Sequence, residues 1–465
     1  MFGDRRRVAV LTAGLAAALS ISGGAVGHDL HSAAPGGTPL LGVNLIQHDF
    51  ARPYCWGGLI IHDYDLAGVR AEVVPALHAM RAAGLETVRL QIPHRHATDK
   101  WIPSAGGRIA EPYRTNLIRL LGDIRRAGMM QVTIQFNPRG PNEPAGWYQE
   151  WDPEPYDPAM FEENWGFIRD VRALVKQYGP ESSRFDIYGE GAPGEWDLAN
   201  KPWWGDYVVR LYRNYVDAFG NSDVTISSVA KGMWNFGTPS DDVERMQNLI
   251  GLLRASGKPL PTYFAVHPSF AAGAYEDLRA VDDVLRRNGL SQPLVISESA
   301  YRSTAVAQAI SEFVRTTGRL VPEVIEWPLY TDNVAGQGFT VQPRCPTLPF
   351  RADEYATVLR GGAAPRVLRG SVGAKGQPSL STPFGHEVKA LDAGTYTLTI
   401  RDTSATHGFQ LSGTPDRGRF AARTTGLRFK GTVTWTVKLR AGFYTYAAKG
   451  PRTVAKEFPV LSPGG

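Results

Sequence analysis

Eight short β-rich runs alternate with amphipathic stretches between about residue 40 and residue 360 of the chain. Alternation of this kind predicts parallel strands joined by right-handed helical crossovers. Eight repeats over such a length predict a closed (β/α)8 TIM barrel, which is the α/β fold that we expect for this part. The runs are LGVNLI (41–46), TVRLQIP (87–93), QVTIQFN (131–137), RFDIYG (184–189), DVTISSV (223–229), TYFAVHP (262–268), PLVISES (293–299) and EVIEWPLY (323–330).

The stretches between the runs carry helix signals. Their apolar residues recur at the spacing of one helix face, and a glycine follows the last turn. Examples are VVPALHAMRAAG (73–84), NLIRLLGDIRRAG (116–128), MFEENWGFIRDVRALVKQYG (160–179) and AVDDVLRRNG (280–289). An open doubly wound sheet is the alternative, and it usually has a glycine-rich phosphate loop after its first strand. GVNLIQHDF (42–50) contains no such loop, which favours the barrel.

The pattern changes at about residue 366. AGTYTLTIRDTSATHGFQLSG (393–413) and GTVTWTVKLRAGFYTYAAKG (431–450) alternate with a period of two residues and have no helical stretch. This predicts a small all-β sandwich. We therefore expect a barrel domain over residues 38–360, a linker region in RGGAAPRVLRGSVGAKGQPS (360–379) and a sandwich domain over residues 366–465.

Residues 1–27 have the pattern of a signal peptide. Three arginines (5–7) precede the apolar stretch 8–26, and AVG (25–27) offers a cleavage site before His28. The arginines also permit twin-arginine export. A membrane anchor is the alternative, but the glycines at 23 and 24 and the missing stop-transfer pattern argue against it. Because no later segment reaches the roughly 18 apolar residues of a membrane span, we expect a secreted, extracellular protein.

Composition narrows the range of partners. No stripe of Lys and Arg with interleaved aromatic residues is present, so we expect no nucleic-acid partner. Eleven tryptophans offer flat apolar faces that suit sugar rings, although most tryptophans in proteins belong to the core. The two cysteines, Cys55 and Cys345, are consistent with a disulfide in an exported chain, but the sequence alone does not pair them. The sequence favours no particular oligomeric state.

Polar residues stand near the carboxyl ends of the predicted strands, where barrels of this type carry their chemistry. In the order of the strands they are Arg89, Asn137, Glu190, His267, Glu298 and Trp327.

Two of these residues, Glu190 and Glu298, are carboxylates on strands that lie across the barrel mouth from each other. Carboxyl groups about 5–5.5 Å apart suit retaining glycoside hydrolysis, in which one protonates the leaving oxygen and the other attacks the anomeric carbon. The charge of Arg89 would keep the nucleophile ionised. Glycines on both sides of Glu190 let the backbone turn and let a sugar approach. A solvated loop glutamate is the alternative for Glu190, and its pairing with Glu298 favours the catalytic role.

From about residue 40 to residue 350 the chain resembles the retaining glycoside hydrolases of clan A, especially the cellulase family (family five) and the β-xylosidase family (family thirty-nine). IYGEGAP (187–193) matches the end of strand four, and VISESAY (295–301) matches the end of strand seven. The resemblance therefore implies that Glu190 is the acid/base and Glu298 the nucleophile of a glycosidase. It also implies a carbohydrate substrate and a reaction that needs no cofactor.

Other parts of the motif match as well. TVRLQIP, AVHPSF (265–270) and IEWPLY (325–330) resemble the segments with the strand-two arginine, the strand-six histidine and the strand-eight tryptophan. The resemblance thus makes Arg89, His267 and Trp327 substrate-site residues. We add Asn137 and Trp234 as candidates for contact with the sugar.

One residue departs from the family pattern. Gly189 stands before Glu190, where the family has an asparagine that binds the 2-hydroxyl of the sugar. Asn137 or Asn235 could take over that contact. The departure also supports an alternative function, that of a non-catalytic carbohydrate-binding protein on a glycosidase barrel.

The resemblance bears on the cysteines and on the C-terminal domain. In a closed barrel the loops after strands one and eight are neighbours, so we predict a Cys55–Cys345 bridge on the catalytic face. The C-terminal domain resembles a cupredoxin sandwich, with His407 at the position of one copper ligand. Ala448 and Pro451 stand where further ligands are expected, so we predict that this domain binds no copper.

Some remaining candidates are less specific. Glu195 and Asp197 could bind substrate hydroxyls or could simply be solvated, and His48, Asp49 and Asp63 follow the first strand. The spacing of the histidines predicts no metal site. A serine hydrolase is disfavoured, because no Gly-x-Ser-x-Gly elbow occurs. Several tryptophans lie in or near the loops after strands three to five: Trp147, Trp151, Trp196, Trp203, Trp204 and Trp234.

Overall fold

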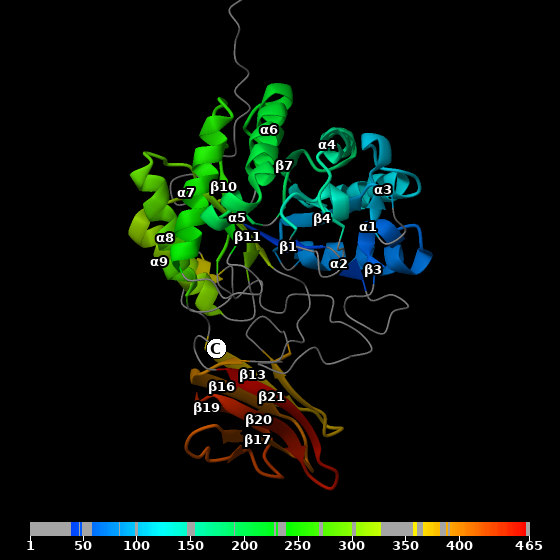
Figure 1. Ribbon diagram of the computed structural model, residues 1–465. Helices are drawn as coiled ribbons and strands as arrows, with labels where there is room; N and C mark the ends of the chain where they lie inside the picture. The colour runs from blue at the N-terminus through cyan, green and yellow to red at the C-terminus, as the bar shows by residue number, and fades with distance from the viewer. Residues whose placement is uncertain are drawn as a thin grey trace, which may run out of the picture. The chain divides into compact units, whose positions relative to one another are not determined.

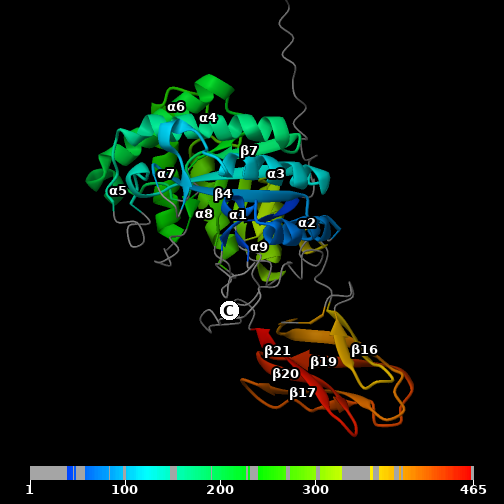
Figure 2. The ribbon, with the colours of Figure 1, turned by 90° about the vertical axis from the view of Figure 1, so that its right-hand side faces the viewer.

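A computed structural model of the chain contains an α/β part that ends with β12 and an all-β part that begins with β13 (Figures 1 and 2). Each part is described by itself. The structure describes residues 39–45, 47–48, 58–82, 84–97, 101–146, 154–189, 191–226, 229–230, 239–268, 273–299, 304–326, 357–359, 366–381, 387–388 and 391–461.

The α/β part is a parallel barrel, as the alternation of strands and helices predicts. Its pairings are all parallel, in the order β8-β7-β6-β4-β1-β12-β11-β10-β9. The strands of this order are β1 (Leu40–Asn44), β4 (Thr87–Arg95), β6 (Gln131–Pro138), β7 (Ser182–Asp186), β8 (Val224–Thr225), β9 (Val229–Ala230), β10 (Phe264–His267), β11 (Leu294–Ser299) and β12 (Glu323–Glu326). A short strand, β5 (Ile102–Pro103), pairs with β4, and two others, β2 (Gln47–His48) and β3 (Gly58–Leu59), form a separate antiparallel pair.

The ring closes through the fifth predicted strand, DVTISSV. Its first part, β8, pairs with β7, and its last part, β9, pairs with β10. One run of sequence thus completes the circle between the strands before and after it. All eight predicted strands therefore take part in the barrel.

Helices follow the strands in sequence and lie around them in Figure 1. They are α1 (Ile60–Asp63), α2 (Ala67–Ala82), α3 (Tyr113–Arg126), α4 (Met160–Tyr178), α5 (Glu195–Asn200), α6 (Pro202–Phe219), α7 (Pro239–Ala255), α8 (Ala274–Arg287) and α9 (Thr304–Thr317), with 3-10 turns at Ala105–Gly107 and Gly140–Asn142. The four helices predicted by pattern are all present, as α2, α3, α4 and α8. In α8, for example, Leu278, Val281 and Leu285 are buried on one face.

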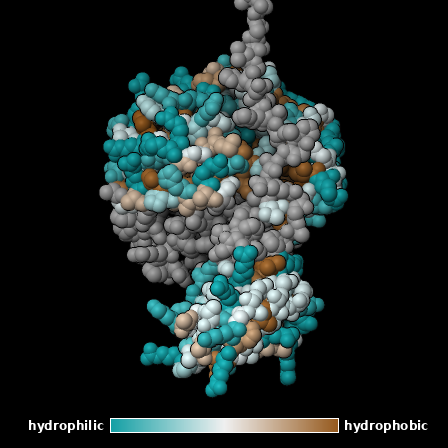
Figure 3. All heavy atoms as spheres, turned by 180° about the vertical axis from the view of Figure 1, so that it is seen from behind, coloured by the Kyte–Doolittle hydropathy of each residue, from teal (hydrophilic) through white to brown (hydrophobic). Residues whose placement is uncertain are grey.

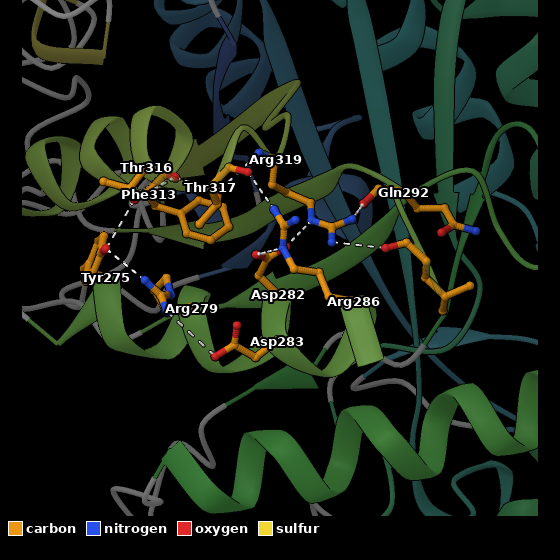
Figure 4. Close-up of polar contacts among 11 residues, drawn as sticks. Tyr275, Arg279, Asp282, Asp283, Arg286, Gln292, Phe313, Thr316, Thr317 and Arg319 are labelled. Atoms are coloured by element: carbon orange, nitrogen blue, oxygen red, sulfur yellow. Dashed lines mark hydrogen bonds and ion pairs between the residues drawn. The ribbon is translucent and has the colours of Figure 1, made fainter. Parts of the chain in front are cut away.

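Ion pairs also connect α8 to the segment that follows α9 (Figure 4). Asp282 on α8 accepts hydrogen bonds from Arg286 at 2.7 Å and from Arg319, which follows α9. Arg319 also donates to the backbone oxygens of Gln292 and Leu290, at 2.7 and 3.1 Å. Arg319 is buried, whereas the side chain of Arg286 is 53% exposed. The same carboxylate therefore holds one arginine inside the protein and one at its surface.

The all-β part is a sandwich of two sheets, in the orders β14-β13-β16-β19 and β15-β21-β20-β17-β18. Alternate residues of both sheets face one hydrophobic core, which includes Leu398 of β16 and Tyr446 of β20. Two pairings, β13 with β16 and β15 with β21, are parallel within otherwise antiparallel sheets. The strands are β13 (Val367–Val372), β14 (Pro378–Ser381), β15 (Leu391–Asp392), β16 (Gly394–Asp402), β17 (Gly408–Pro415), β18 (Arg423–Thr424), β19 (Gly431–Leu439), β20 (Gly442–Lys449) and β21 (Val454–Leu461).

The linker prediction is wrong for part of the stretch 360–379. Residues 367–372 and 378–379 belong to the strands β13 and β14, so they are part of the sandwich. In β13 buried and more exposed residues alternate, because Leu368, Gly370 and Val372 face inward. This short period-two signal is hidden by the glycines and small residues around it.

Seen from behind in Figure 3, the sandwich surface is mostly of intermediate hydropathy.

Candidate active site

The barrel interior is polar, and side chains meet there from strands that are not neighbours in the sheet. The order of strands places β1 between β4 and β12, and β6 between β4 and β7. Contacts from β4 to β12, β11 and β7 must therefore cross the interior. These contacts fall into two layers, which we name the basal cluster and the rim cluster.

The basal cluster lies near the amino ends of the strands and consists of Thr87, Gln131, Thr133, Arg184 and Glu323. Glu323 is its central acceptor: Oε1 accepts hydrogen bonds from Thr87, Gln131 and Thr133, at 2.9, 2.8 and 3.3 Å. Oε2 pairs with the guanidinium of Arg184. All five residues are buried, and the carboxylate has a donor at each oxygen. Such a satisfied network stabilises the fold.

The rim cluster lies nearer the carboxyl ends and consists of Asn44, Arg89, Asp186, His267 and Glu298. Arg89 on β4 is completely buried. Its Nη1 donates to Glu298 Oε1 at 2.8 Å, to Ser297 O at 3.0 Å and to Asn44 Oδ1 at 3.1 Å. The opposite charge of the guanidinium therefore stabilises an ionised Glu298.

Glu298 is the fifth residue of β11 and is only 1% exposed. His267, the last residue of β10, places its Nδ1 3.5 Å from Glu298 Oε2. Arginine therefore contacts one carboxylate oxygen, and histidine faces the other. The structure brings together three of the residues that the sequence singles out: Arg89, His267 and Glu298. A carboxylate held in one orientation at this end of a barrel can act as a nucleophile or as a base.

Asp186 completes the cluster, although it was not predicted as a site residue. It ends β7, is 1% exposed, and its Oδ2 lies 3.6 Å from Arg89 Nη2, beyond hydrogen-bond distance. Neither of its carboxyl oxygens has a hydrogen-bond partner in the described part of the chain. Burial raises the pKa of Asp186 to about 7, with a further rise from the charge of Glu298, while Arg89 and His267 oppose the rise.

Asn137 occupies the space that a side chain at position 189 would need. Asn137 lies near the end of β6 and is 4% exposed. A Cβ added to Gly189 would lie 2.1 Å from Asn137 Oδ1. The glycine backbone also donates to Phe136 O at 2.9 Å, which holds the two strands together here. The glycine thus makes room for an amide that comes from the neighbouring strand.

One of the two glycines that flank Glu190 in the sequence has a backbone conformation typical of glycine. Gly191 has a φ of +95°, in the left-handed region that favours glycine. Glu190 itself lies outside the described residues, as do four other predicted site residues: Trp234, Trp327, Cys55 and Cys345. Their predicted roles remain predictions.

The secondary candidates have structural partners. Asp197 accepts hydrogen bonds from Gly194 N and Arg245 at the start of α5, at 2.9 and 3.1 Å. Asp63 is buried next to His62, and the Nδ1 of His62 lies 2.7 Å from the Oδ1 of Asp63. Glu195 is exposed on α5. In the part of the chain that the structure describes, no group of three or more His, Cys, Asp or Glu residues could hold a metal ion.

One observation of the structure concerns membrane spans. Across the described residues, none of the helices is both long and apolar enough to span a bilayer.

Comparisons with known proteins give structural likeness only. No protein-family profile and no curated protein sequence matches the chain. A β-1,4-D-mannanase from Cryptopygus antarcticus is 13% identical, with a TM-score of 0.42, over 70% of this chain and 91% of its own. A family 39 glycoside hydrolase from Bacteroides cellulosilyticus is 14% identical, with a TM-score of 0.42, over 91% of this chain and 82% of its own.

A third similar structure is an endoglucanase from Pseudomonas stutzeri. It is 14% identical, with a TM-score of 0.37, over 62% of this chain and 85% of its own. All three of these proteins are glycoside hydrolases. Similarities of this size do not assign an activity to the present chain.

Proposed function

We propose that this protein is a retaining glycoside hydrolase with Glu298 as the nucleophile and Glu190 as the acid/base. The proposal rests on one observation above all: Glu298 stands near the carboxyl end of a barrel strand, buried, with Arg89 on one oxygen and His267 facing the other. This placement orients a carboxylate at the face where barrels carry their reactions.

The reaction takes two displacements. Glu298 attacks the anomeric carbon while the bond to the leaving oxygen breaks, and Glu190 gives its proton to that oxygen. Water then attacks the glycosyl ester, Glu190 removes a proton from the water, and Glu298 leaves as a carboxylate. No oxidant, reductant or cofactor is needed. Asn137, in the space beside Gly189, is the residue that we place against the sugar hydroxyl next to the reacting carbon.

The test is turnover of activated aryl glycosides by Glu298→Ala and Glu190→Ala. We expect Glu298→Ala to lose all measurable hydrolysis. Glu190→Ala should lose most activity towards substrates with poor leaving groups and least towards those with good ones, because only the former need a proton donor. Azide should rescue both variants, giving a product of inverted configuration with Glu298→Ala and of retained configuration with Glu190→Ala.

A matched control is Glu162→Gln. Glu162 lies on α4, its side chain is 67% exposed and it pairs with Arg210, away from both clusters. This variant should keep the activity of the unchanged protein. Full activity of Glu298→Ala would remove the proposal.

A non-catalytic carbohydrate-binding protein is the second candidate, favoured by the glycine at position 189. Binding of an oligosaccharide without release of reducing ends over a long incubation would support it. A screen of aryl glycosides and polysaccharides with a reducing-sugar readout separates the two candidates.

We further propose that the protein is exported after cleavage before His28 and that Cys55 pairs with Cys345. Sequencing the amino terminus of protein recovered outside the cell tests the first part, and His28 is the expected start. Mass spectrometry of a non-reduced digest tests the second part, and two free thiols would contradict it. We propose that the sandwich has a structural or sugar-binding role and binds no copper.

A further inference from the structure

Two carboxyl groups share one guanidinium inside the barrel. Arg89 extends from β4 between Glu298 on β11 and Asp186 on β7. All three side chains are at most 2% exposed, so solvent screens their charges little. Two ionised carboxylates around a single arginine would leave an excess negative charge in this buried space, which is costly.

The sharing is unequal. Arg89 Nη1 is 2.8 Å from Glu298 Oε1, but Nη2 is 3.6 Å from Asp186 Oδ2. Glu298 also faces His267, whose Nδ1 is 3.5 Å from Oε2. Asp186, by contrast, receives no hydrogen bond at either oxygen from any residue that the structure describes. The geometry therefore stabilises a charge on Glu298 and leaves a charge on Asp186 without comparable support.

We propose that Asp186 is a positioning residue, which carries a proton in the working site and so leaves the guanidinium of Arg89 to Glu298. The proposal rests on the proposed function, because it describes how the nucleophile is held. Asp186 acts through Arg89 and does not touch the sugar. When Asp186 loses its proton, Arg89 is drawn towards it and Glu298 loses both orientation and a neutral neighbour.

The surroundings of Asp186 agree with this role. The charged and titratable groups that face it are Arg89 from β4, His267 from β10 and Glu298 from β11. Of these, Glu298 disfavours its charge and the other two favour it, while burial outweighs both. The pKa of Asp186 is thereby raised to about 7, so the proton is lost near neutral pH.

The first test measures stability and does not depend on activity. When folding raises the pKa of a carboxyl group, the folded state loses stability as the pH rises from the pKa of the unfolded state to the pKa of the folded state. Asp186→Asn removes this titration. We expect the denaturation midpoint of Asp186→Asn to rise relative to the unchanged protein between about pH 4 and pH 7 and to level off above.

Asp123→Asn is the matched control. Asp123 is also buried, but it accepts hydrogen bonds from Tyr64 and Arg70, at 2.7 and 2.9 Å, and from Arg126. Burial alone would raise its pKa, yet these bonds lower the pKa of Asp123 to about 2. Asp123→Asn should therefore be less stable than the unchanged protein at neutral pH. A midpoint difference for Asp186→Asn that does not vary with pH would overturn the proposal.

The second test follows kcat/KM with an aryl glycoside whose leaving group needs no proton. With such a substrate the alkaline limb does not report the acid/base. We expect kcat/KM of the unchanged protein and of Asp186→Glu to fall above about pH 7. For Asp186→Asn, kcat/KM should stay within about twofold of its own value at neutral pH up to pH 9. The same alkaline limb in Asp186→Asn would overturn the positioning role.

The two tests separate the two proposals. In one outcome the protein has no glycosidase activity, but Asp186→Asn still gains stability between pH 4 and pH 7. This outcome would refute the proposed function and support the inference that Asp186 carries a proton. Normal activity with an unchanged alkaline limb and a pH-independent midpoint difference would refute only the role of Asp186.

Discussion

The basal cluster and the rim cluster each combine a buried arginine with a buried glutamate in the same barrel, yet they differ in how many carboxylates share the arginine. Glu323 in the basal cluster has three hydrogen-bond donors and a buried arginine. In the rim cluster a single arginine serves both Glu298 and Asp186. The comparison teaches that a buried carboxylate with its own arginine stabilises the fold, whereas two carboxylates that share one arginine cannot both be charged at little cost.

Removing the basal arginine should have the largest effect on stability. Arg184→Met leaves Glu323 buried without its counter-charge, so we expect the free energy of unfolding to fall by about 3–5 kcal/mol. Denaturant titration at neutral pH measures this fall. Arg184→Lys keeps the charge and should lose less. A loss of less than about 1 kcal/mol in the free energy of unfolding would mean that the Arg184–Glu323 pair contributes no more than an exposed ion pair.

Removing the rim arginine should mainly affect activity. Arg89→Met takes away the donor that orients Glu298, and we expect kcat/KM to fall by about a hundred- to a thousandfold. Its loss of stability should be smaller than that of Arg184→Met, because His267 still faces the Glu298 carboxylate after the change. Among the contacts that the structure describes, Glu323 has no second basic residue. The two variants are compared by aryl glycoside turnover and denaturant titration. A reversed order of the two stability losses would break the comparison.

Asp123 extends the comparison to the helix layer. The lowered pKa of its carboxyl means that Asp123 contributes stability above its unfolded pKa and that this contribution is lost as the pH falls from about 4 to about 2. Two of its donors, Arg70 and Arg126, are more than half exposed, so we expect Asp123→Asn to cost only about 1–2 kcal/mol at pH 7. Midpoints measured from pH 7 to pH 2.5 should converge with those of the unchanged protein. Parallel curves would contradict this.

The smallest effect is expected at the surface end of the Asp282 pair. Arg286→Ala removes a half-exposed partner and should change the free energy of unfolding by no more than about 0.5 kcal/mol. Arg319→Met removes the buried partner of the same carboxylate and should cost several times more, which denaturant titration of both variants can measure. Equal losses would mean that burial does not decide the strength of these pairs.

Much of the fold could be predicted from the sequence, because the period of the apolar residues changes with each element. The runs TVRLQIP and QVTIQFN, for example, became β4 and β6 in parallel register. The strands β13 and β14 were missed, since they are short and lie among glycines. His267 and Glu298 were found because each stands near the carboxyl end of a predicted strand, and Arg89, the third residue of its strand, was found because the run TVRLQIP resembles the family's strand-two segment.

Asp186 could not be placed in the site from its spacing. Its neighbours in the rim cluster come from β4, β10 and β11, more than eighty residues away along the chain, and only barrel closure brings them close. A signal was nevertheless present: a carboxylate between Phe185 and Ile187, in a strand expected to be buried, needs an explanation. Glu323 and Arg184 carry the same signal, which indicates a polar interior.

The closure of the barrel also determines where it opens most easily. Among the described residues, the ladders on either side of the fifth strand join two residue pairs each, and we call this part of the barrel wall the seam; β4 and β6 join through eight pairs. Fewer shared backbone bonds mean a lower local cost of separation, so amide protons along this seam should exchange with solvent before those of the opposite wall. A ring with a short ladder next to β7 can widen beside Asp186 while the wall between β4 and β6 stays paired.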